Sequence, residues 1–415
     1  MPSPRRFLDG STSLPLSAGW GLNLCIYLGL FSTLFLLMVL LLWQLIRQLG
    51  NSVGNSAVQP RRSIREPPGL IREHVLRLEA QHLFVLAAFA LLHNIHTNMA
   101  SRGSVQPFVH FNAKQDVELL HKAMKGLGTD EEAILRLLVS RSNSQRQKIK
   151  AAYKSRHGKD LVSALQSEIG GKFEKLIVAL MTPPVAYDAG ELRNAIKGAG
   201  TEENVLIEIL ASRTQDEVKE IIKAYKKQYR KSLESDVSSD TTGHFKRMLV
   251  ILLQASREKG VNEGGIEKDA KELFAAGEQK CGTDEDKFIS ILGNRSTEHL
   301  MKVFEAYKKL SGYEIEESIE RETSGSLQEL LLAVVKCTRS VPAYFAECLY
   351  HSMRRAGTDD DTLIRVMVSR SEVDMLDIKA EFKRMYSQSL YTTIQEDTSG
   401  DYMTALLYLT GGNDG

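Results

Sequence analysis

The stretch Met124–Asp130 (MKGLGTD) is the first of four related stretches that combine glycine with a following threonine. The other three are Ile196–Thr201 (IKGAGT), Lys280–Asp284 (KCGTD) and Met353–Asp359 (MRRAGTD). Their final glycines stand at positions 128, 200, 282 and 357, so the spacings are 72, 82 and 75 residues. Self-similarity at a period of this length indicates an internal repeat. The chain from about residue 109 onward is therefore predicted to consist of four repeats.

Two further residue types recur at fixed distances from the final glycines and strengthen this prediction. An arginine stands 13 residues after each final glycine, at Arg141, Arg213, Arg295 and Arg370. An acidic residue stands 40 residues after each final glycine, at Glu168, Asp240, Glu322 and Asp397. Because the arginines fall near predicted helix ends, we expect them to bond carbonyl and carboxylate groups inside the repeats.

The predicted fold class is all-α, with about five short helices in each repeat. After the first glycine stretch, Ile134, Leu137 and Leu138 share one helical face through their spacing. Thr129 is expected to cap this helix, with Glu132 as its capping-box partner. No alternating apolar run is long enough to predict a sheet. The predicted repeats are 109–181, 182–257, 266–340 and 341–413, and a glycine-containing linker at 258–265 is expected to divide the array into two halves.

The glycine stretch and the distant acid together suggest a calcium site. Glycines two residues apart can adopt positive φ and turn successive carbonyl oxygens toward one point. Calcium takes 6–8 oxygen ligands, often carbonyls together with a carboxylate. In the first repeat these would be the carbonyls of Met124, Gly126 and Gly128 and the carboxylate of Glu168, which is expected at the start of another helix. The remaining positions could be filled by phosphate oxygens of a lipid headgroup.

The alternative for any single copy is structural, with glycines that end one helix and acids that cap another. Recurrence in four copies favours calcium. No EF-hand loop is present.

Composition narrows the classes of function. The formal net charge is +1, so no global field attracts nucleic acid, and we expect no nucleic-acid partner. The four cysteines have no metal-ligand spacing, which fits a reducing compartment. The sequence holds no phosphate-binding loop, nucleophile elbow, zinc-protease or dinucleotide motif, so we expect no enzyme activity.

Residues 1–98 differ from the rest of the chain. Residues 24–45 carry no charge over 22 positions, which predicts a membrane-spanning helix. The rival interpretation is a signal peptide with Arg5 and Arg6 at its basic end, but its apolar core would be shorter. Arginines crowd the C-terminal flank, so the positive-inside rule leaves the repeats in the cytosol. We interpret this extension as a separate reading frame joined to an independent cytosolic protein that begins near Met99, and it loosely resembles a small single-pass membrane protein.

The loop, the arginine and the acid together resemble the annexin family, over about residues 99–415. Similar stretches include LLLAVVKCTRSVPAYFAE, GTDDDTLIRVMVSRSE and TSGDYMTALLYL. The resemblance implies four five-helix repeats in a curved disc and calcium-dependent binding to anionic phospholipid such as phosphatidylserine. It further implies a cytoplasmic protein that is peripheral on membranes with calcium and self-associates laterally there. If residues 1–98 are retained, the protein would be anchored by a single membrane pass.

The resemblance also implies calcium ligands in every repeat. Carried over by position, they are Met124, Gly126, Gly128 and Glu168; Gly198, Gly200 and Asp240; Gly277, Lys280, Gly282 and Glu322; and Met353, Gly357 and Asp397. Cys281 stands where related annexins carry a tryptophan that meets the bilayer, so repeat three is expected to hold lipid less firmly. Arg355 replaces a loop glycine, which puts strain on the fourth site.

Two other functions remain open from the sequence. One is an ion pathway through the array, since Asp188, Glu191, Arg213 and Arg365 match positions of a polar channel in the family. A structural ion-pair network is the favoured interpretation of these residues. The other is a helical-repeat protein scaffold with vestigial loops.

Overall fold

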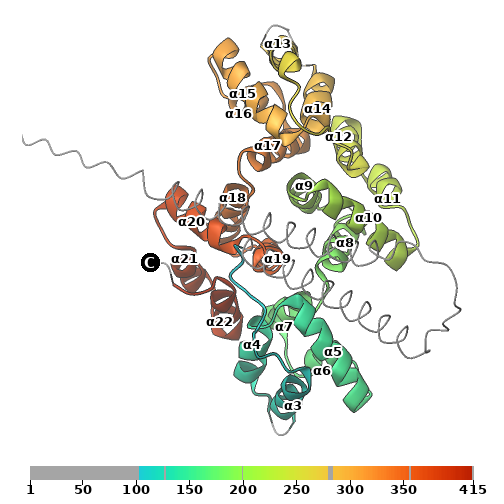
Figure 1. The fold of residues 1–415 in the computed structure, drawn as a ribbon, viewed down its shortest axis with the longest axis vertical. Helices are drawn as coiled ribbons and strands as arrows, with labels where there is room; N and C mark the ends of the chain where they lie inside the picture. The colour runs from blue at the N-terminus through green and yellow to red at the C-terminus, as the bar shows by residue number, and fades with distance from the viewer. Residues whose placement is uncertain (1–101, 126–127, 199, 279–283, 355–356, 414–415) are drawn as a thin grey trace, which may run out of the picture. The chain divides into compact units, whose positions relative to one another are not determined.

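A computed structural model describes residues 102–125, 128–198, 200–278, 284–354 and 357–413. Within these ranges every regular element is a helix, and the helices fall into four groups of five (Figure 1). The all-α prediction with five helices per repeat is therefore confirmed for the described residues.

The helix bounds are as follows. Repeat one contains α3 (Ala113–Ala123), α4 (Glu131–Val139), α5 (Asn143–His157), α6 (Leu161–Gln166) and α7 (Gly171–Leu180). Repeat two contains α8 (Pro184–Ala195), α9 (Glu203–Ser212), α10 (Gln215–Tyr229), α11 (Leu233–Asp240) and α12 (Gly243–Gln254). Repeat three adds the 3-10 turn η1 (Glu263–Gly265) before α13 (Ile266–Ala276), α14 (Glu285–Asn294), α15 (Thr297–Ser311), α16 (Ile315–Glu322) and α17 (Gly325–Arg339). Repeat four contains α18 (Val341–Arg354), α19 (Asp360–Arg370), α20 (Met375–Tyr386), α21 (Leu390–Asp397) and α22 (Gly400–Leu409).

Each repeat buries an apolar core between its helices. The first and third helices of a repeat pack together, as α3 does on α5 and α13 on α15. In repeat one, Leu120, Leu138, Ile149 and Leu176 come from four different helices, and all four are fully buried. Burial of each such side chain is worth about 1.5–3 kcal/mol, so the packing of the five helices is what stabilises these short segments.

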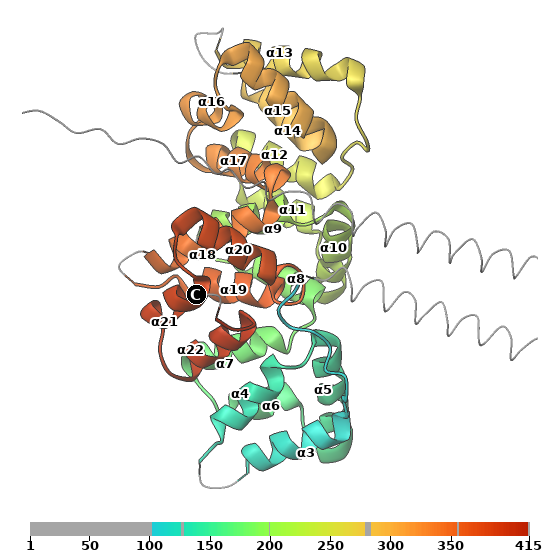
Figure 2. The ribbon, with the colours of Figure 1, turned by 60° about the vertical axis from the view of Figure 1, so that its left-hand side comes forward.

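The repeats associate as one with four and two with three, which differs from the predicted division at residues 258–265. Helices α4 and α7 pack on α22 and α19, whereas α9 and α12 pack on α17 and α14 (Figures 1 and 2). Lys172 Nζ at the start of α7 lies 2.6 Å from Asp360 at the start of α19, which links repeats one and four. The linker is therefore an ordinary connection between repeats that pack together.

The segment before repeat one lies along repeat four. The backbone N–H of Arg102 donates to the carbonyl of Val373 at 3.1 Å, and the N–H of Val105 donates to that of Ser371 at 2.9 Å. A Cβ on Gly103 would come within 2.4 Å of the backbone of Glu372, so only glycine fits this close approach. These contacts add a second connection between repeats one and four.

Among the described residues, no helix is long and apolar enough to cross a bilayer. The predicted membrane span at 24–45 lies outside the described residues.

Candidate functional site

The glycine loops begin where the first helix of each repeat ends, and a backbone hydrogen bond closes each loop. The N–H of Asp130 donates to the carbonyl of Ala123, and Glu202 donates to Ala195 in the same way. In repeat four Asp359 donates to Ser352, so these three loops each span seven residues. In repeat three Asp284 donates to Ala276, eight residues back. The third loop is thus one residue longer, which explains why its sequence matches the others less closely.

The final glycine of each described loop has a conformation that favours glycine. The φ angles of Gly128, Gly200 and Gly357 are 92°, 102° and 100°. A Cβ at any of these positions would meet nothing within 4 Å, so backbone strain, and not crowding, selects glycine there. Gly198 also has a positive φ, of 144°. The predicted ligands Gly126, Lys280 and Gly282, and the departures Cys281 and Arg355, lie outside the described residues.

The threonine after the final glycine bonds the acid from the distant part of the repeat. Thr129 Oγ1 donates to Glu168 Oε2 at 2.8 Å, Thr201 Oγ1 to Asp240 Oδ2 at 2.6 Å, and Thr358 Oγ1 to Asp397 Oδ2 at 2.7 Å. The structure therefore brings the loop and the acid together in three repeats, although 39 residues separate the partners. In repeat three, the proximity is seen at Gly277, where a Cβ would lie 3.3 Å from Glu322 Cγ.

The prediction that Thr129 caps the following helix is wrong. The N-cap of α4 is Asp130, whose side chain accepts a hydrogen bond from the N–H of Ala133. Asp359 caps α19 in the same way. An aspartate is as good a cap as threonine, and its presence one residue later leaves the threonine hydroxyl available for the distant acid.

The prediction that the acids lie at the start of a helix is also wrong. Asp240, Glu322 and Asp397 are the last residues of α11, α16 and α21, and Glu168 follows α6 by two residues. The next helix begins three residues later, at a glycine with φ between 62° and 65°: Gly171, Gly243, Gly325 or Gly400. Each acid therefore lies in a tight connection between two helices, beside the glycine loop.

This geometry combines a loop whose carbonyls can turn outward with one carboxylate. Hard cations such as calcium prefer such oxygen ligands. Within the described ranges, no three histidine, cysteine, aspartate or glutamate side chains gather where they could hold a metal ion. The backbone carbonyls would therefore have to supply most ligands in any site built on these loops.

Comparison with known proteins finds the same repeat unit four times. Residues 115–180, 187–252, 268–334 and 344–409 each match the annexin family. The chain belongs to the annexin family. It is 60% identical to annexin A5 of Gallus gallus over 316 residues, which are 76% of this chain and 98% of that protein. It is 59% identical to annexin A5 of Homo sapiens over 315 residues, which are 75% of this chain and 98% of that protein.

Solved annexin structures have the same fold. Chicken annexin V superposes with a TM-score of 0.72 at 59% identity, covering 75% of this chain and 100% of that one. A calcium-bound structure of annexin (Sm)1 superposes with a TM-score of 0.67 at 35% identity, covering 75% of this chain and 93% of that one. Residues 18–76, outside the annexin repeats, match the family Small integral membrane protein 43.

The four recurring arginines bond carboxylates inside the annexin repeats, as predicted. Arg141 makes a bidentate pair with Asp116 at 2.8 and 2.9 Å. Arg213 and Arg295 pair in the same manner with Asp188 and Asp269, which occupy the corresponding place on the first helix of their repeats.

In repeat four that place is taken by an aromatic residue. Phe345 stands 25 residues before Arg370, and the guanidinium carbon lies 4.8 Å from the centre of its ring. The carboxylate partner is Asp374 instead, with bonds of 2.6 and 2.8 Å.

The residues that were matched to a polar channel of the family form ion pairs, either with one another or with Glu208. Asp188 is paired with Arg213, and Arg365 makes a bidentate pair with Glu208 at 2.7 and 2.9 Å. Glu191 lies 3.8 Å from Arg365, and burial raises the pKa of this carboxyl although Arg365 opposes the shift. Glu208, which is 3% exposed, was not predicted as part of this network. The sequence around an acid in an apolar helix does not indicate a partner 157 residues away. This pairing supports the structural ion-pair interpretation.

Proposed function

We propose that the four glycine loops and their distant acids bind calcium, and that the bound calcium holds the phosphate groups of anionic phospholipid. Calcium-dependent binding of phospholipid is the general activity of the annexin family, to which the chain belongs. The observation that carries the finer proposal is the hydrogen bond from each loop threonine to the acid 39 residues later, made in repeats one, two and four.

The proposed ligands are backbone carbonyls with one acid per repeat. In repeat one they are Met124, Gly126, Gly128 and Glu168, and in repeat two Gly198, Gly200 and Asp240. In repeat three they are Gly277, Lys280, Gly282 and Glu322, and in repeat four Met353, Gly357 and Asp397. When calcium is bound, it supplies a positive charge that attracts lipid phosphate.

The chemistry of this ligand set explains why lipid and calcium would bind together. Two or three carbonyls and one carboxylate per repeat provide fewer than the 6–8 oxygens that calcium takes. They also supply only one formal negative charge, and calcium affinity follows the charge and rigidity of the ligands. A lipid phosphate would complete the shell and add charge. Because the net charge of the chain is only +1, calcium would provide the attraction that the protein surface lacks.

The ligand set is tested by calorimetric titration of residues 99–415 with calcium. The match to annexin A5 of Gallus gallus spans 316 residues of this chain and 98% of that protein. We expect Asp397→Asn to abolish the heat from repeat four. The matched control is Glu396→Gln, because Glu396 is the adjacent acid and, among the described residues, accepts a hydrogen bond from Gln388 alone, at 2.8 Å.

The two variants have distinguishable outcomes. If Asp397→Asn leaves the titration unchanged, as Glu396→Gln is expected to do, repeat four holds no calcium through Asp397. If the unaltered protein takes up no calcium, the scaffold interpretation replaces the present one.

A further inference from the structure

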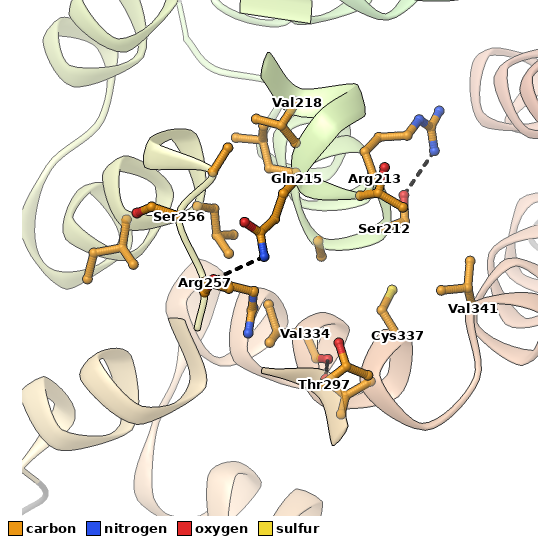
Figure 3. A pocket seen from close by; sticks show the side chains of 17 residues that line it. Ser212, Arg213, Gln215, Val218, Ser256, Arg257, Thr297, Val334, Cys337 and Val341 are labelled. Atoms are coloured by element: carbon orange, nitrogen blue, oxygen red, sulfur yellow. Dashed lines mark hydrogen bonds between the residues drawn. The ribbon is translucent and has the colours of Figure 1, made fainter. Parts of the chain in front are cut away.

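A cavity of about 310 Å³ lies where repeats two, three and four meet (Figure 3). Its walls come from the ends of α9 and α12, the starts of α10 and α15, the C-terminal part of α17 and the first residue of α18. None of the proposed calcium ligands lines it. Apolar side chains such as Val218, Val334 and Val341 form part of the wall, and Arg257 and Thr297 bring polar groups to it.

Arg257 carries a charge for which the described part of the chain provides no counter-charge. Its Nη1 donates to the carbonyl of Arg295 at 3.0 Å, which is the only hydrogen bond of this guanidinium to a described residue. No described carboxylate lies within 4.0 Å of it. A guanidinium has five N–H donors, so most of them remain available. Arg257 is half-buried, and its burial lowers the pKa of the guanidinium to about 10.

The nearest candidate counter-ions are committed to other partners. Glu258, the next residue, pairs with Arg295 at 2.6 Å. Asp188 pairs with Arg213, the second arginine that lines the cavity. Burial raises the pKa of the Cys337 thiol to about 12, so it stays neutral near pH 7 and does not balance the charge.

Two helix starts also border the cavity, and their first turns already hold the acids Asp216, Glu217 and Glu298. Thr214 caps α10 and Thr297 is the first residue of α15, and each of these helices has 15 residues. The N-terminus of a helix carries a partial positive charge and favours anions. In Figure 3 the Arg257 side chain lies between Gln215 and Thr297, whereas the guanidinium of Arg213 is directed away from it, on the side of Ser212.

We propose that this cavity binds a small oxyanion with an apolar body, namely a carboxylate or a phosphate monoester. The oxyanion would accept hydrogen bonds from the free N–H groups of Arg257, which provide the missing ion pair. The apolar body would lie against Val218, Val334 and Val341. This site is independent of the calcium loops and goes beyond calcium-dependent lipid binding.

The proposal is tested with the full chain in a nonionic detergent, by titration with phenyl phosphate, benzoate, inorganic phosphate and benzyl alcohol. We expect phenyl phosphate or benzoate to bind at millimolar concentrations or below. The tighter of these two identifies the oxyanion as phosphate or carboxylate. Inorganic phosphate should bind more weakly, because it lacks the apolar body. Benzyl alcohol, which has a similar body and no charge, should bind at least about tenfold more weakly than the better anion.

Variants assign the binding to Arg257. Arg257→Gln should weaken binding of the better anion at least about tenfold, and Arg257→Lys should retain part of it, since a charge remains. Arg136→Gln is the matched control, because Arg136 is an exposed arginine paired with Glu132 on the surface. Equal binding by Arg257→Gln and the unaltered protein would overturn the proposal. Equal binding of benzyl alcohol and the anions, or absence of binding by both anions, would also overturn it, and these results do not depend on whether a variant folds.

Discussion

At the scale of single residues, the loop threonines of repeats one, two and four each join a glycine loop to an acid 39 residues later. The spacing of glycine and acid predicted which residues belong to one site, and the structure brings them together. The same sequence suggested that Thr129 caps α4, because Thr129 with Glu132 fits the capping-box pattern. The observed cap is Asp130, which is also a good N-cap residue but has no such partner three residues later. Which of two adjacent polar residues faces the helix depends on the path of the loop. That path is set by the distant acid, which local sequence does not reveal.

Removing the Thr129 hydroxyl should weaken calcium binding in repeat one. In Thr129→Val the carboxylate of Glu168 loses the hydrogen bond that orients it toward the loop. A hydrogen bond to a charged group contributes about 1.5–3 kcal/mol, so we expect the affinity of this site to fall by at least about tenfold. Calorimetric titration measures the change. Thr404→Val is the control, because the half-buried Thr404 lies outside the glycine loops and its hydroxyl donates to the carbonyl of Gly400 in its own helix. An equal loss in both variants would contradict the role of Thr129.

His157 should make the repeats less stable in mild acid. Partial burial lowers the pKa of its ring, and His121, stacked 4.1 Å away, lowers it further. The unfolded chain, with a histidine pKa of about 6.5, then binds more protons than the folded chain, so stability rises with pH. The contribution of neutral His157 is complete above about pH 6.5 and is lost as the pH falls below it.

The measurement is the unfolding temperature of residues 99–415 at about pH 7.5 and pH 5.5. We expect a lower value at pH 5.5, and a smaller difference between the two in His157→Phe than in the unaltered protein. The exposed His110 provides the control variant His110→Phe, which should keep the full difference. If His157→Phe shows the same pH dependence as the unaltered protein, other groups cause that dependence.

At the scale of elements, the helices were predictable and the connections between them less so. The spacing of Ile134, Leu137 and Leu138 indicated α4 correctly, and all three side chains are buried. The acids were placed at helix starts, although Asp240, Glu322 and Asp397 end their helices. An acid beside a glycine is compatible with either end of a helix. The position is decided by the tertiary contact with the loop threonine.

Replacing Gly128 should disturb its loop through backbone strain. A Cβ at this position meets no atom within 4 Å, but the φ of 92° is unfavourable for alanine. We expect Gly128→Ala to cost about 1–3 kcal/mol, measured either as lost stability or as lost calcium affinity in repeat one. Gly190→Ala is the control inside α8, where a Cβ would lie 3.7 Å from Tyr229 Oη in ordinary contact. It should stabilise the protein by about 0.5–1 kcal/mol. Two variants of equal stability and equal calcium affinity would contradict this account of the loop.

At the scale of the whole molecule, the number of repeats was predictable and their association was not. The spacing of four glycines indicated four repeats, which the match to the annexin family confirms. The expected division at residues 258–265 was wrong, because repeat one packs on repeat four. Its ion pairs, such as Lys172 with Asp360, join residues that are nearly 190 positions apart. Such pairs leave no periodic signal in the sequence.

The predicted membrane span at 24–45 should keep the full chain on membranes under conditions that release its annexin portion. Residues 18–76 match the family Small integral membrane protein 43, and the uncharged run is long enough to cross a bilayer. We expect the full chain to stay with cell membranes after calcium is removed with a chelator, whereas residues 99–415 are released. Fractionation of cells that express each form measures this. Release of both forms would show that the segment does not anchor the protein.

Co-sedimentation of residues 99–415 with lipid vesicles measures whether calcium on the glycine loops joins the protein to a membrane. Vesicles that contain phosphatidylserine should carry the protein into the pellet with calcium and leave it in solution with chelator. Vesicles of phosphatidylcholine alone should carry little protein in either case. The variant with Glu168→Gln, Asp240→Asn, Glu322→Gln and Asp397→Asn together should stay in solution even with calcium. Equal sedimentation with calcium and with chelator, or undiminished sedimentation of this variant, would contradict the claim that calcium on these loops joins the protein to the membrane.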